Sequence, residues 1–317
     1  MRAIGFTEFG GPEVFRELRL DELHAGPGEV RIRIRAAAVN PSDSLTRSGR
    51  TKQLLAEQVP DLAYPPPPYV VGWDIAGVID EVGPDTAGDC AVGDRVCAVT
   101  PMGLGGYAEH AVVSARSAVR APANADDAAA CTLPMNGLTA RVAVDRLGLP
   151  AGATVAVTGA AGTLGGYVVQ LAKADGLRVV ADASEADEAL VRSLGADEIV
   201  RRGDDVAKRI RQVCPDGVDG LVDCAVQDDL VLDAVRDGGA IATVRFFAGS
   251  TERDITWHPV FVGEHVTDQA RLDHLRQQVE DGALTLRVAE TFPAEQAAEA
   301  HRRLEAGGVR GRLVLTF

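Results

Sequence analysis

The sequence predicts an α/β protein of two domains, in which a β-barrel-like domain is followed by a doubly wound, mostly parallel sheet. In the first third of the chain, short apolar strands are separated by closely spaced glycines, as is typical of a compact β domain. From about residue 123 onwards, strands alternate with helices, which is the order that builds a parallel sheet. The 317 residues, 46% of them hydrophobic, are sufficient for two cores.

Three segments define the first domain. Residues 30–35 alternate apolar side chains with arginines, the period-two pattern of a half-buried strand. Residues 40–43, Asn-Pro-Ser-Asp, are interpreted as a turn. The prolines at 65–68 have no backbone N–H to donate to a sheet, so we expect a surface loop there.

The second domain is expected to follow an alanine-rich helical stretch that begins near residue 126. We expect strands at 154–158, 178–181, 220–223 and 239–244, and helices at 164–174, 187–194, 268–281 and 294–306, before a last strand at 312–317.

Charge and cysteine content exclude several classes of protein. The formal net charge of −14 makes nucleic acid or an anionic membrane an improbable main partner. No stretch is long and apolar enough to span a bilayer, and residues 1–4 start directly on a strand pattern, which argues against a signal peptide. The five cysteines are odd in number and form no CxxC pair, so we expect no disulfide framework, no structural zinc and a reducing cytoplasm.

The main chemical signal is a glycine-rich turn between a predicted strand and a predicted helix. It comprises Gly159, Ala160, Ala161, Gly162, Thr163, Leu164 and Gly165. We expect Gly159 to turn the chain sharply, Gly162 to leave room for a diphosphate, and Gly165 to let the helix lie close to the sheet. The helix start supplies amide donors and the positive end of the helix dipole. The alternative is a tight turn that binds no ligand.

The end of the next strand selects between NADH and NADPH. Asp182 is a candidate for the carboxylate that binds a ribose hydroxyl, but it precedes the usual position by one residue, which would turn it to the other face. Ser184, Arg201 and Arg202 are candidates for binding a 2′-phosphate, although the arginines also fit a solvated loop. These residues favour NADPH over NADH. Asp187 and Glu188 lie nearby and would oppose a phosphate, so NADH stays the alternative coenzyme.

Several motifs resemble one family. They are Asn40–Asp43, Gly72–Gly77, Val92–Val96, Gly106–Glu109, Asn136–Ala140, the turn at Gly162 and Leu194–Asp197. Together they resemble the quinone oxidoreductase (zeta-crystallin-like) branch of the medium-chain dehydrogenases/reductases, nearly end to end. The resemblance implies a GroES-like domain over residues 1–122, completed by residues 264–317, and a Rossmann NADP-binding domain over residues 123–263. It also implies an active site in the cleft between the domains, a quinone or enone substrate and a homodimer.

The departures from this family also carry information. Asn40 and Ser42 stand where zinc-dependent relatives have a cysteine, and Trp73-Asp74 replaces their His-Glu pair. Zinc needs three or four converging ligands, so we expect no catalytic metal and no alcohol dehydrogenation that depends on one. Relatives that reduce enoyl thioesters carry a tyrosine after Asn-Pro-x-Asp, and no tyrosine occurs between Asp43 and Tyr64. That route is therefore disfavoured.

The resemblance also suggests roles for individual residues. Asn40 is the expected polar group that faces the nicotinamide or the acceptor carbonyl, and Asp43 either positions it or caps a turn. Thr139 either contacts the nicotinamide end or bonds to its own helix. Main-chain groups of Val244 and Arg245 are expected at the nicotinamide, and Gly311 and Arg312 near the coenzyme phosphates. His258, His265, His274 and His301 show no metal-binding spacing and are interpreted as surface or interface residues.

Three functions remain open. The first is an NADPH-dependent reductase of quinones or activated enones, which needs orientation of its partners more than a general acid. The second is an enoyl or polyketide-tailoring reductase of secondary metabolism. The third is an NADPH-binding sensor or scaffold with little catalysis.

Overall fold

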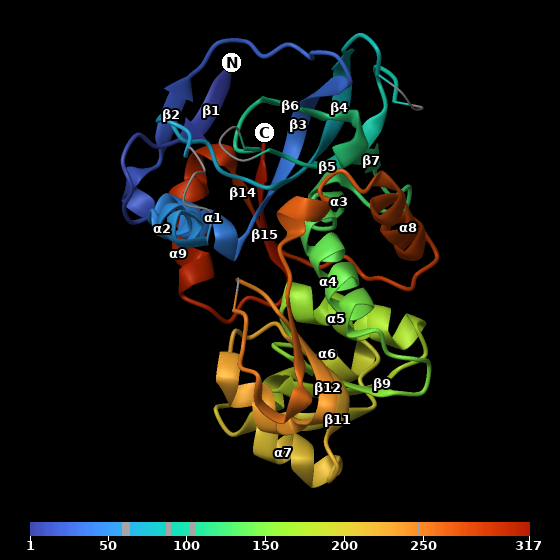
Figure 1. Ribbon diagram of the computed structural model, residues 1–317. Coiled ribbons are helices and arrows are strands. Elements are labelled where there is room, and N and C mark those ends of the chain that lie inside the picture. The colour runs from blue at the N-terminus through green and yellow to red at the C-terminus, as the bar shows by residue number, and fades with distance from the viewer. Residues whose placement is uncertain (59–63, 87–89, 102–104, 246) are drawn as a thin grey trace. The chain divides into compact units, whose positions relative to one another are not determined.

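The structure is a computed structural model that describes residues 1–58, 64–86, 90–101, 105–245 and 247–317 (Figure 1). By its packing the chain divides into two compact units. Unit 1 contains residues 1–135, 266–280 and 286–317, and unit 2 contains residues 136–265 and 281–285. The predicted fold class is confirmed, whereas the domain boundaries expected after residues 122 and 263 stay predictions.

Unit 1 is built on a sheet whose central strand, β3 (Glu29–Val39), pairs with three others. Val30, Ile32 and Ile34 on this strand are buried while the arginines between them are at least partly exposed, which confirms the half-buried strand. The strands run in the order β14-β15-β3-β4-β5-β7, with β6 also on β3, and β1 and β2 form a separate pair. Their bounds are β1 Arg2–Gly5, β2 Arg16–Arg19, β4 Asp74–Val82, β5 Arg95–Val99, β6 His110–Ser114, β7 Ala118–Arg120, β14 Val288–Pro293 and β15 Arg312–Thr316.

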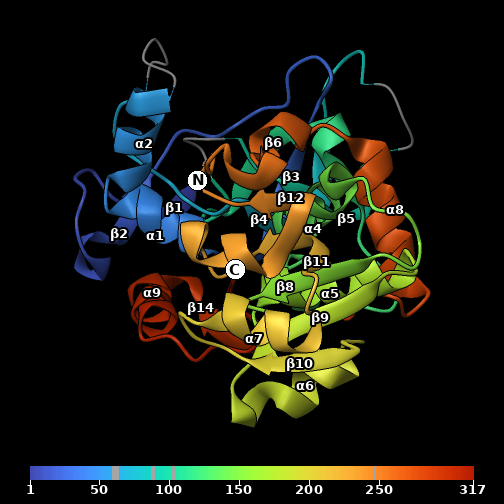
Figure 2. The same cartoon turned by 60° about the horizontal axis from the view of Figure 1, so that its bottom comes forward.

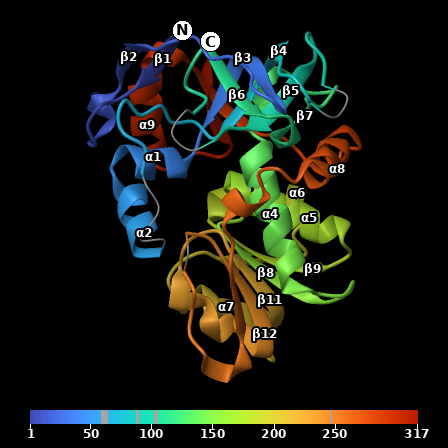
Figure 3. The same ribbon diagram turned by 45° about the horizontal axis from the view of Figure 1, so that its top comes forward.

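Both ends of the chain lie in unit 1, since β1 and β15 belong to it (Figure 3). The return of the chain to its first unit is what the resemblance implied for the C-terminal segment. The helices of this unit are α1 Pro41–Arg47, α2 Arg50–Gln58, α3 Asp127–Ala130, α8 Gln269–Glu280 and α9 Ala297–Glu305, and α4 Pro134–Leu147 begins in it.

The segment interpreted as a turn, residues 40–43, is instead the start of helix α1. Asn40 is the N-cap, and Pro41 occupies the first helical turn. Asp43 completes a capping box, because its carboxylate accepts from the backbone N–H of Asn40 at 2.8 Å. Proline fits the first turn because its missing N–H would have no intrahelical acceptor there. The same residue types therefore begin a helix where a turn was predicted.

Unit 2 is a six-stranded sheet in which every pairing is parallel. The order β10-β9-β8-β11-β12-β13 corresponds to 3-2-1-4-5-6, the order of doubly wound dinucleotide-binding sheets. Helices α6 and α7 lie alongside β10 (Figure 2). The bounds are β8 Thr154–Thr158, α5 Thr163–Ala174, β9 Arg178–Ala183, α6 Glu188–Ser193, β10 Glu198–Arg201, α7 Val206–Val213, β11 Val218–Asp223, β12 Val235–Thr243 and β13 Thr256–Pro259.

Shorter 3-10 helices connect these elements. They are η1 Pro12–Val14, η2 Ala115–Ser117, η3 Glu185–Asp187, η4 Asp228–Ala234, η5 Glu252–Asp254, η6 Val262–His265 and η7 Ala294–Gln296. Among the helices that the structure describes, none combines the length and the apolarity needed to cross a bilayer.

Candidate functional site

The glycine-rich turn joins β8 to α5 in unit 2, as predicted. Gly159 has φ +64°, a conformation that a side chain disfavours, so the sharp turn accounts for this glycine. A Cβ on Gly165 would lie 2.3 Å from the Gly159 carbonyl oxygen, so the first turn of α5 packs directly on the glycine turn. Gly165 therefore lets the helix lie close to the glycine turn itself.

Gly162 differs from the other two glycines. It is the N-cap of α5 with φ −71°, which any residue adopts, and a Cβ there would meet only the Gly159 oxygen, at 3.1 Å. This contact is tight but longer than the 2.3 Å at Gly165, so the fold disfavours a side chain less strongly at Gly162 than at Gly165. The first turn of a helix leaves backbone N–H groups without intrahelical acceptors, here at Thr163, Leu164 and Gly165. A bare N-cap beside these donors fits a diphosphate, so the residues present fit a dinucleotide.

A row of buried polar side chains crosses the sheet next to this turn, and the sequence analysis missed most of it. Thr158 ends β8 and donates to the Asp223 carboxylate at 2.5 Å. Asp223 ends β11 and also accepts from backbone amides of the loop that follows, including that of Gln227 at 2.7 Å. Thr243 ends β12 and donates to the Phe247 carbonyl at 2.5 Å. Each of these side chains fixes a loop at the carboxyl edge of the sheet, where ligands bind in such folds.

Asp182 is the fourth member of this row. Its Oδ1 accepts from the Ala160 amide at 3.1 Å, and its residue is 4% exposed. Burial raises the pKa of this carboxyl, while the hydrogen bond from Ala160 and the charge of Arg202 act in the opposite direction. Asp182 is thus directed at the glycine turn, the other face anticipated from its position in the strand.

Two of the three residues expected to select the coenzyme, Ser184 and Arg201, are engaged with carboxylates. The Ser184 hydroxyl donates to Asp187 at 2.5 Å. The guanidinium of Arg201 lies 3.8 Å from Glu185 and 3.5 Å from Glu188. Arg202 is exposed and donates its backbone N–H to the Ala183 carbonyl. Of the two arginines, Arg202 therefore has the greater scope to bind a phosphate.

The residues predicted at the nicotinamide end are also in unit 2. Val244 and Arg245 follow β12 directly, and Arg245 adopts φ +63°. Thr139 is half-buried on α4. The positive φ at Arg245 marks a tight bend at the strand end. The main-chain contact predicted there stays a prediction.

In unit 1, Asn40 and Asp43 belong to a buried polar cluster. Neither residue exposes any surface. The Asn40 amide nitrogen donates to Asp74 Oδ2 at 2.8 Å, and Asp74 Oδ1 accepts from the Met135 backbone at 2.5 Å. Asp43 Oδ1 accepts from the Gly72 amide at 3.0 Å, so one carboxylate holds both the start of α1 and the segment before β4.

Burial perturbs the two carboxyl groups of this cluster. Desolvation raises the pKa of Asp43 to about 7, although the hydrogen bonds from the backbone N–H groups of Asn40 and Gly72 lower it. Desolvation likewise raises the pKa of Asp74 to about 6, against its bonds from Met135 and Asn40. The Arg312 guanidinium favours the charged form of both, and this residue is itself only 5% exposed. Arg312 donates to the Val39 carbonyl at 3.4 Å, so it belongs to this cluster, and its predicted contact with coenzyme phosphate stays a prediction.

His301 was interpreted as a surface or interface residue, and the surface interpretation is wrong. It is completely buried: its Nδ1 lies 3.1 Å from Arg47 Nη1, and its Nε2 lies 3.2 Å from the Tyr107 hydroxyl. Burial first, and then the Arg47 charge, lower the pKa of His301 to about 3, so the ring is neutral. Because Arg47 can only donate, Nδ1 accepts and Nε2–H donates to Tyr107. The sequence pattern of helix α9 did not indicate that His301 points inward. Its partner Arg47 lies 254 residues away in the sequence.

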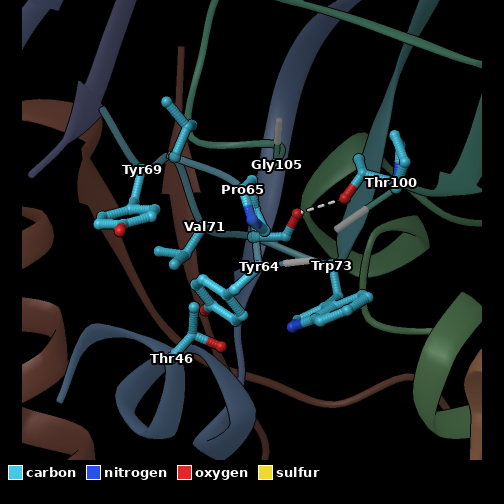
Figure 4. Close-up of a pocket in the computed structure, with 11 residues that line it drawn as sticks. Thr46, Tyr64, Pro65, Tyr69, Val71, Trp73, Thr100 and Gly105 are labelled. Carbon is cyan, nitrogen blue, oxygen red and sulfur yellow. Dashed lines mark hydrogen bonds between the residues drawn. The ribbon is translucent and has the colours of Figure 1, made fainter. Parts of the chain in front are cut away.

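A pocket lies next to this cluster (Figure 4). Its empty space is about 340 Å³, part of it open to solvent. Thr100 at its wall donates to the Gly72 carbonyl at 2.6 Å, and Trp73 contributes to the lining. The described lining is mainly apolar and aromatic: Thr46, Tyr64, Pro65, Tyr69, Val70, Val71, Gly72, Trp73, Thr100, Pro101 and Gly105. Such a surface suits a flat apolar molecule.

Two family models and many known proteins match this chain. Residues 26–123 match the family model described as "Alcohol dehydrogenase GroES-like domain", and residues 194–315 match the one described as "Zinc-binding dehydrogenase". A quinone oxidoreductase of Homo sapiens is 30% identical to the chain, over 99% of this chain and 97% of that protein. The chain belongs to the quinone oxidoreductase family of the medium-chain dehydrogenases/reductases. It is therefore an oxidoreductase.

Other members of this family and its structural neighbours are similarly distant. A 2-haloacrylate reductase of Burkholderia sp is 29% identical, with 96% of both chains covered. The solved structure of the quinone oxidoreductase from Coxiella burnetii has a TM-score of 0.86 at 25% identity, covering 100% of this chain and 99% of that one. An NAD-dependent alcohol dehydrogenase structure has a TM-score of 0.85 at 30% identity over the whole of both chains.

The name of one matching model raises the question of zinc in this oxidoreductase. Within the described ranges, no group of three or more His, Cys, Asp or Glu side chains is arranged to hold a metal ion. Asp74, which stands where zinc-dependent relatives have a glutamate, accepts from the Asn40 side-chain amide and from the Met135 backbone, and Asn40 is a weak ligand for zinc. These residues do not fit zinc, and we derive no step through it.

The predicted site residues thus fall into two groups, one in each unit. Unit 2 brings together the glycine turn, Ser184, Arg201, Arg202, Val244 and Arg245 at the carboxyl edge of one sheet. Unit 1 brings together Asn40, Asp43 and Arg312. Sequence reasoning missed Thr158, Asp223 and Thr243, although a polar residue at the end of each apolar strand was a readable signal.

Proposed function

We propose that the protein is an NADPH-dependent, zinc-independent reductase that transfers a hydride to a quinone or an activated enone. The observation that carries the proposal is the glycine turn with its bare N-cap at Gly162, on a sheet of dinucleotide-binding order. The acceptor class is supported by the names of relatives, a quinone oxidoreductase, a 2-haloacrylate reductase and an NADPH-dependent alkenal/one oxidoreductase of Arabidopsis thaliana. Quinones, acrylates and alkenals share a carbon–carbon double bond conjugated to an electron-withdrawing group.

For the coenzyme, we assign the diphosphate to the turn at Gly159–Gly165 and the nicotinamide end to Thr139, Val244 and Arg245. A bound reduced nicotinamide supplies the hydride. We assign the 2′-phosphate of NADPH chiefly to Arg202, because Arg201 and Ser184 are occupied by carboxylates. Gly311 and Arg312 stay predicted phosphate neighbours, and NADH is the alternative donor.

For the acceptor, we assign the pocket beside Gly72. We expect its aromatic and aliphatic walls to pack against a flat molecule and orient it. Orientation can contribute roughly 7–11 kcal/mol, whereas one general acid contributes a factor of about a hundred to ten thousand in rate. A quinone or enone is already a strong electrophile, so its reduction tolerates a proton taken from water.

The buried pair of Asn40 and Asp43 supports this pocket. Asp43 fixes the amide of Gly72, which lines the pocket, so we assign it a positioning role. The Asn40 side chain is held by Asp74, and we propose that it contributes to the same wall. Direct contact between Asn40 and the acceptor carbonyl stays a prediction. We further propose a homodimer in the cytoplasm, on the basis of the family alone.

The test is to follow NADPH absorbance with a quinone, an α,β-unsaturated ketone and an enoyl thioester as acceptors. Turnover of the quinone or ketone is expected. Turnover of the thioester alone would favour the tailoring reductase, and tight NADPH binding without oxidation by any acceptor would favour a sensor or scaffold. Removing Arg202 by Arg202→Ala should weaken NADPH far more than NADH. An equal loss for both coenzymes would reject the assigned 2′-phosphate contact.

A further inference from the structure

The contact between Asp182 and the glycine turn calls for an explanation, because a carboxylate so close to a diphosphate site repels the ligand. Asp182 lies near the end of β9, next to β8 in the sheet, and accepts from the Ala160 amide at 3.1 Å. Two opposed effects follow from one side chain. Its oxygen satisfies a buried backbone donor of the turn, and its charge disfavours a nearby anion.

The surroundings of Asp182 make both effects strong. The residue is 4% exposed, so the Ala160 amide has little access to water as a substitute acceptor. The groups that influence the carboxylate are the amides of Gly159 and Ala160, the charge of Arg202 and the charge of Asp223. Asp223 is held by Thr158 and by the loop after β11, and it repels Asp182. The interactions that favour the Asp182 carboxylate in this position are therefore its bond to the turn and the charge of Arg202.

We propose that Asp182 is a positioning residue for the coenzyme: its hydrogen bond to Ala160 holds the glycine turn in its phosphate-binding shape, while its charge lowers the affinity of that turn for the diphosphate. The proposal rests on the dinucleotide site of the proposed function. It predicts that removing the charge and removing the acceptor change coenzyme affinity in opposite directions. A residue that merely stabilised the sheet would not do so.

Two substitutions of similar size separate the effects. Asp182→Asn removes the charge and keeps an oxygen that accepts from Ala160. Asp182→Leu removes both. We expect Asp182→Asn to bind NADH more tightly than the natural protein, and Asp182→Leu to bind it roughly tenfold more weakly than Asp182→Asn, a factor that corresponds to about 1.4 kcal/mol. NADH is the probe because it lacks the 2′-phosphate.

A matched control makes its contact at the opposite end of β8. Asp219 on β11 accepts from the Thr154 amide at 2.8 Å, where β8 begins, and pairs with Arg236 at 2.8 Å. Like Asp182, it accepts a hydrogen bond from a backbone amide of the neighbouring segment. Four residues of β8 separate Thr154 from the glycine turn. Asp219→Leu should lower the unfolding temperature without coenzyme and leave the Kd for NADH unchanged.

The experiment measures NADH binding by fluorescence titration and thermal unfolding of the ligand-free protein for all variants. If the natural protein binds neither NADH nor NADPH, the proposed function itself fails. If it binds NADH and the two Asp182 variants share its Kd, the inference about Asp182 is overturned. It is also overturned if Asp182→Leu and Asp219→Leu weaken NADH to the same extent, because Asp182 would then act through the stability of the sheet. If Asp182→Leu does not fold, the tighter binding expected of Asp182→Asn still decides the outcome.

Discussion

Replacing Arg47 tests whether the buried network of unit 1 stabilises that unit. The Arg47 side chain is 4% exposed and makes three hydrogen bonds, to the Gly10 carbonyl at 3.1 Å, to His301 Nδ1 at 3.1 Å and to Glu305 at 2.6 Å. Arg47→Met keeps most of the packing of the aliphatic stem and removes all three.

The size of the effect depends on which partners are left unsatisfied. Glu305 is 40% exposed and can return to water, and the Ser44 hydroxyl, 3.2 Å from His301 Nδ1, can donate in place of Arg47. The Gly10 carbonyl loses its guanidinium donor. An unpaired group costs about 1–3 kcal/mol when it is buried and less when it is partly exposed, as Gly10 is. A hydrogen bond to a charged group contributes about 1.5–3 kcal/mol, so we expect a loss of about 2–4 kcal/mol. This range starts lower than the ~3–5 kcal/mol expected when a fully buried ion pair is broken, because Glu305 is partly exposed.

The assay is urea-induced unfolding followed by circular dichroism, with Arg302→Met as the matched control. Arg302 neighbours His301 on α9 but is 51% exposed and pairs with Glu299 three residues earlier, at 3.2 Å. Its removal should change the free energy of unfolding by less than about 0.5 kcal/mol. The affinity for NADH should be unaffected in both variants, because the glycine turn belongs to unit 2. Equal stability of the two variants would refute the argument from burial.

Three further predictions concern other parts of the chain. Gly165→Ala forces a methyl group against the Gly159 backbone and should lower the free energy of unfolding by ~1–3 kcal/mol in urea titrations, whereas a loss below 0.5 kcal/mol would show that the helix can shift. The raised pKa values of Asp43 and Asp74, about 7 and about 6, mean that the native state keeps protons that the unfolded chain releases near pH 4, so these groups reduce stability as pH rises from 4 to 7. Asp74→Asn should therefore show a smaller decrease than the natural protein between pH 5 and pH 7 in the same titrations, and identical pH profiles would contradict the assigned shift. Burial raises the pKa of Cys97 to about 12, so this thiol should resist alkylation in the native protein and react only on unfolding, as mass spectrometry of labelled protein would show.

Local patterns in the sequence determined the elements and the coenzyme turn. The alternation at residues 30–35, the proline loop and the strand–glycine turn–helix unit depend on neighbours within a few residues, and the structure has each of them. The start of α1 was equally local, because Asn40, Pro41 and Asp43 form a readable capping box, and its interpretation as a turn was avoidable. The strand β13 carried little signal, since it has only four residues, ends on a proline, and none of the four is fully buried.

The tertiary structure alone decided which distant side chains meet. Asp182 reaches Ala160, Thr158 reaches Asp223, and His301 reaches Arg47, through strand register and helix packing that no local pattern encodes. The physical reason is that a buried polar group must find a partner, while the sequence records only that the group is polar. The sequence by itself therefore determined where a dinucleotide could bind, and the fold decided which side chains hold that site in shape.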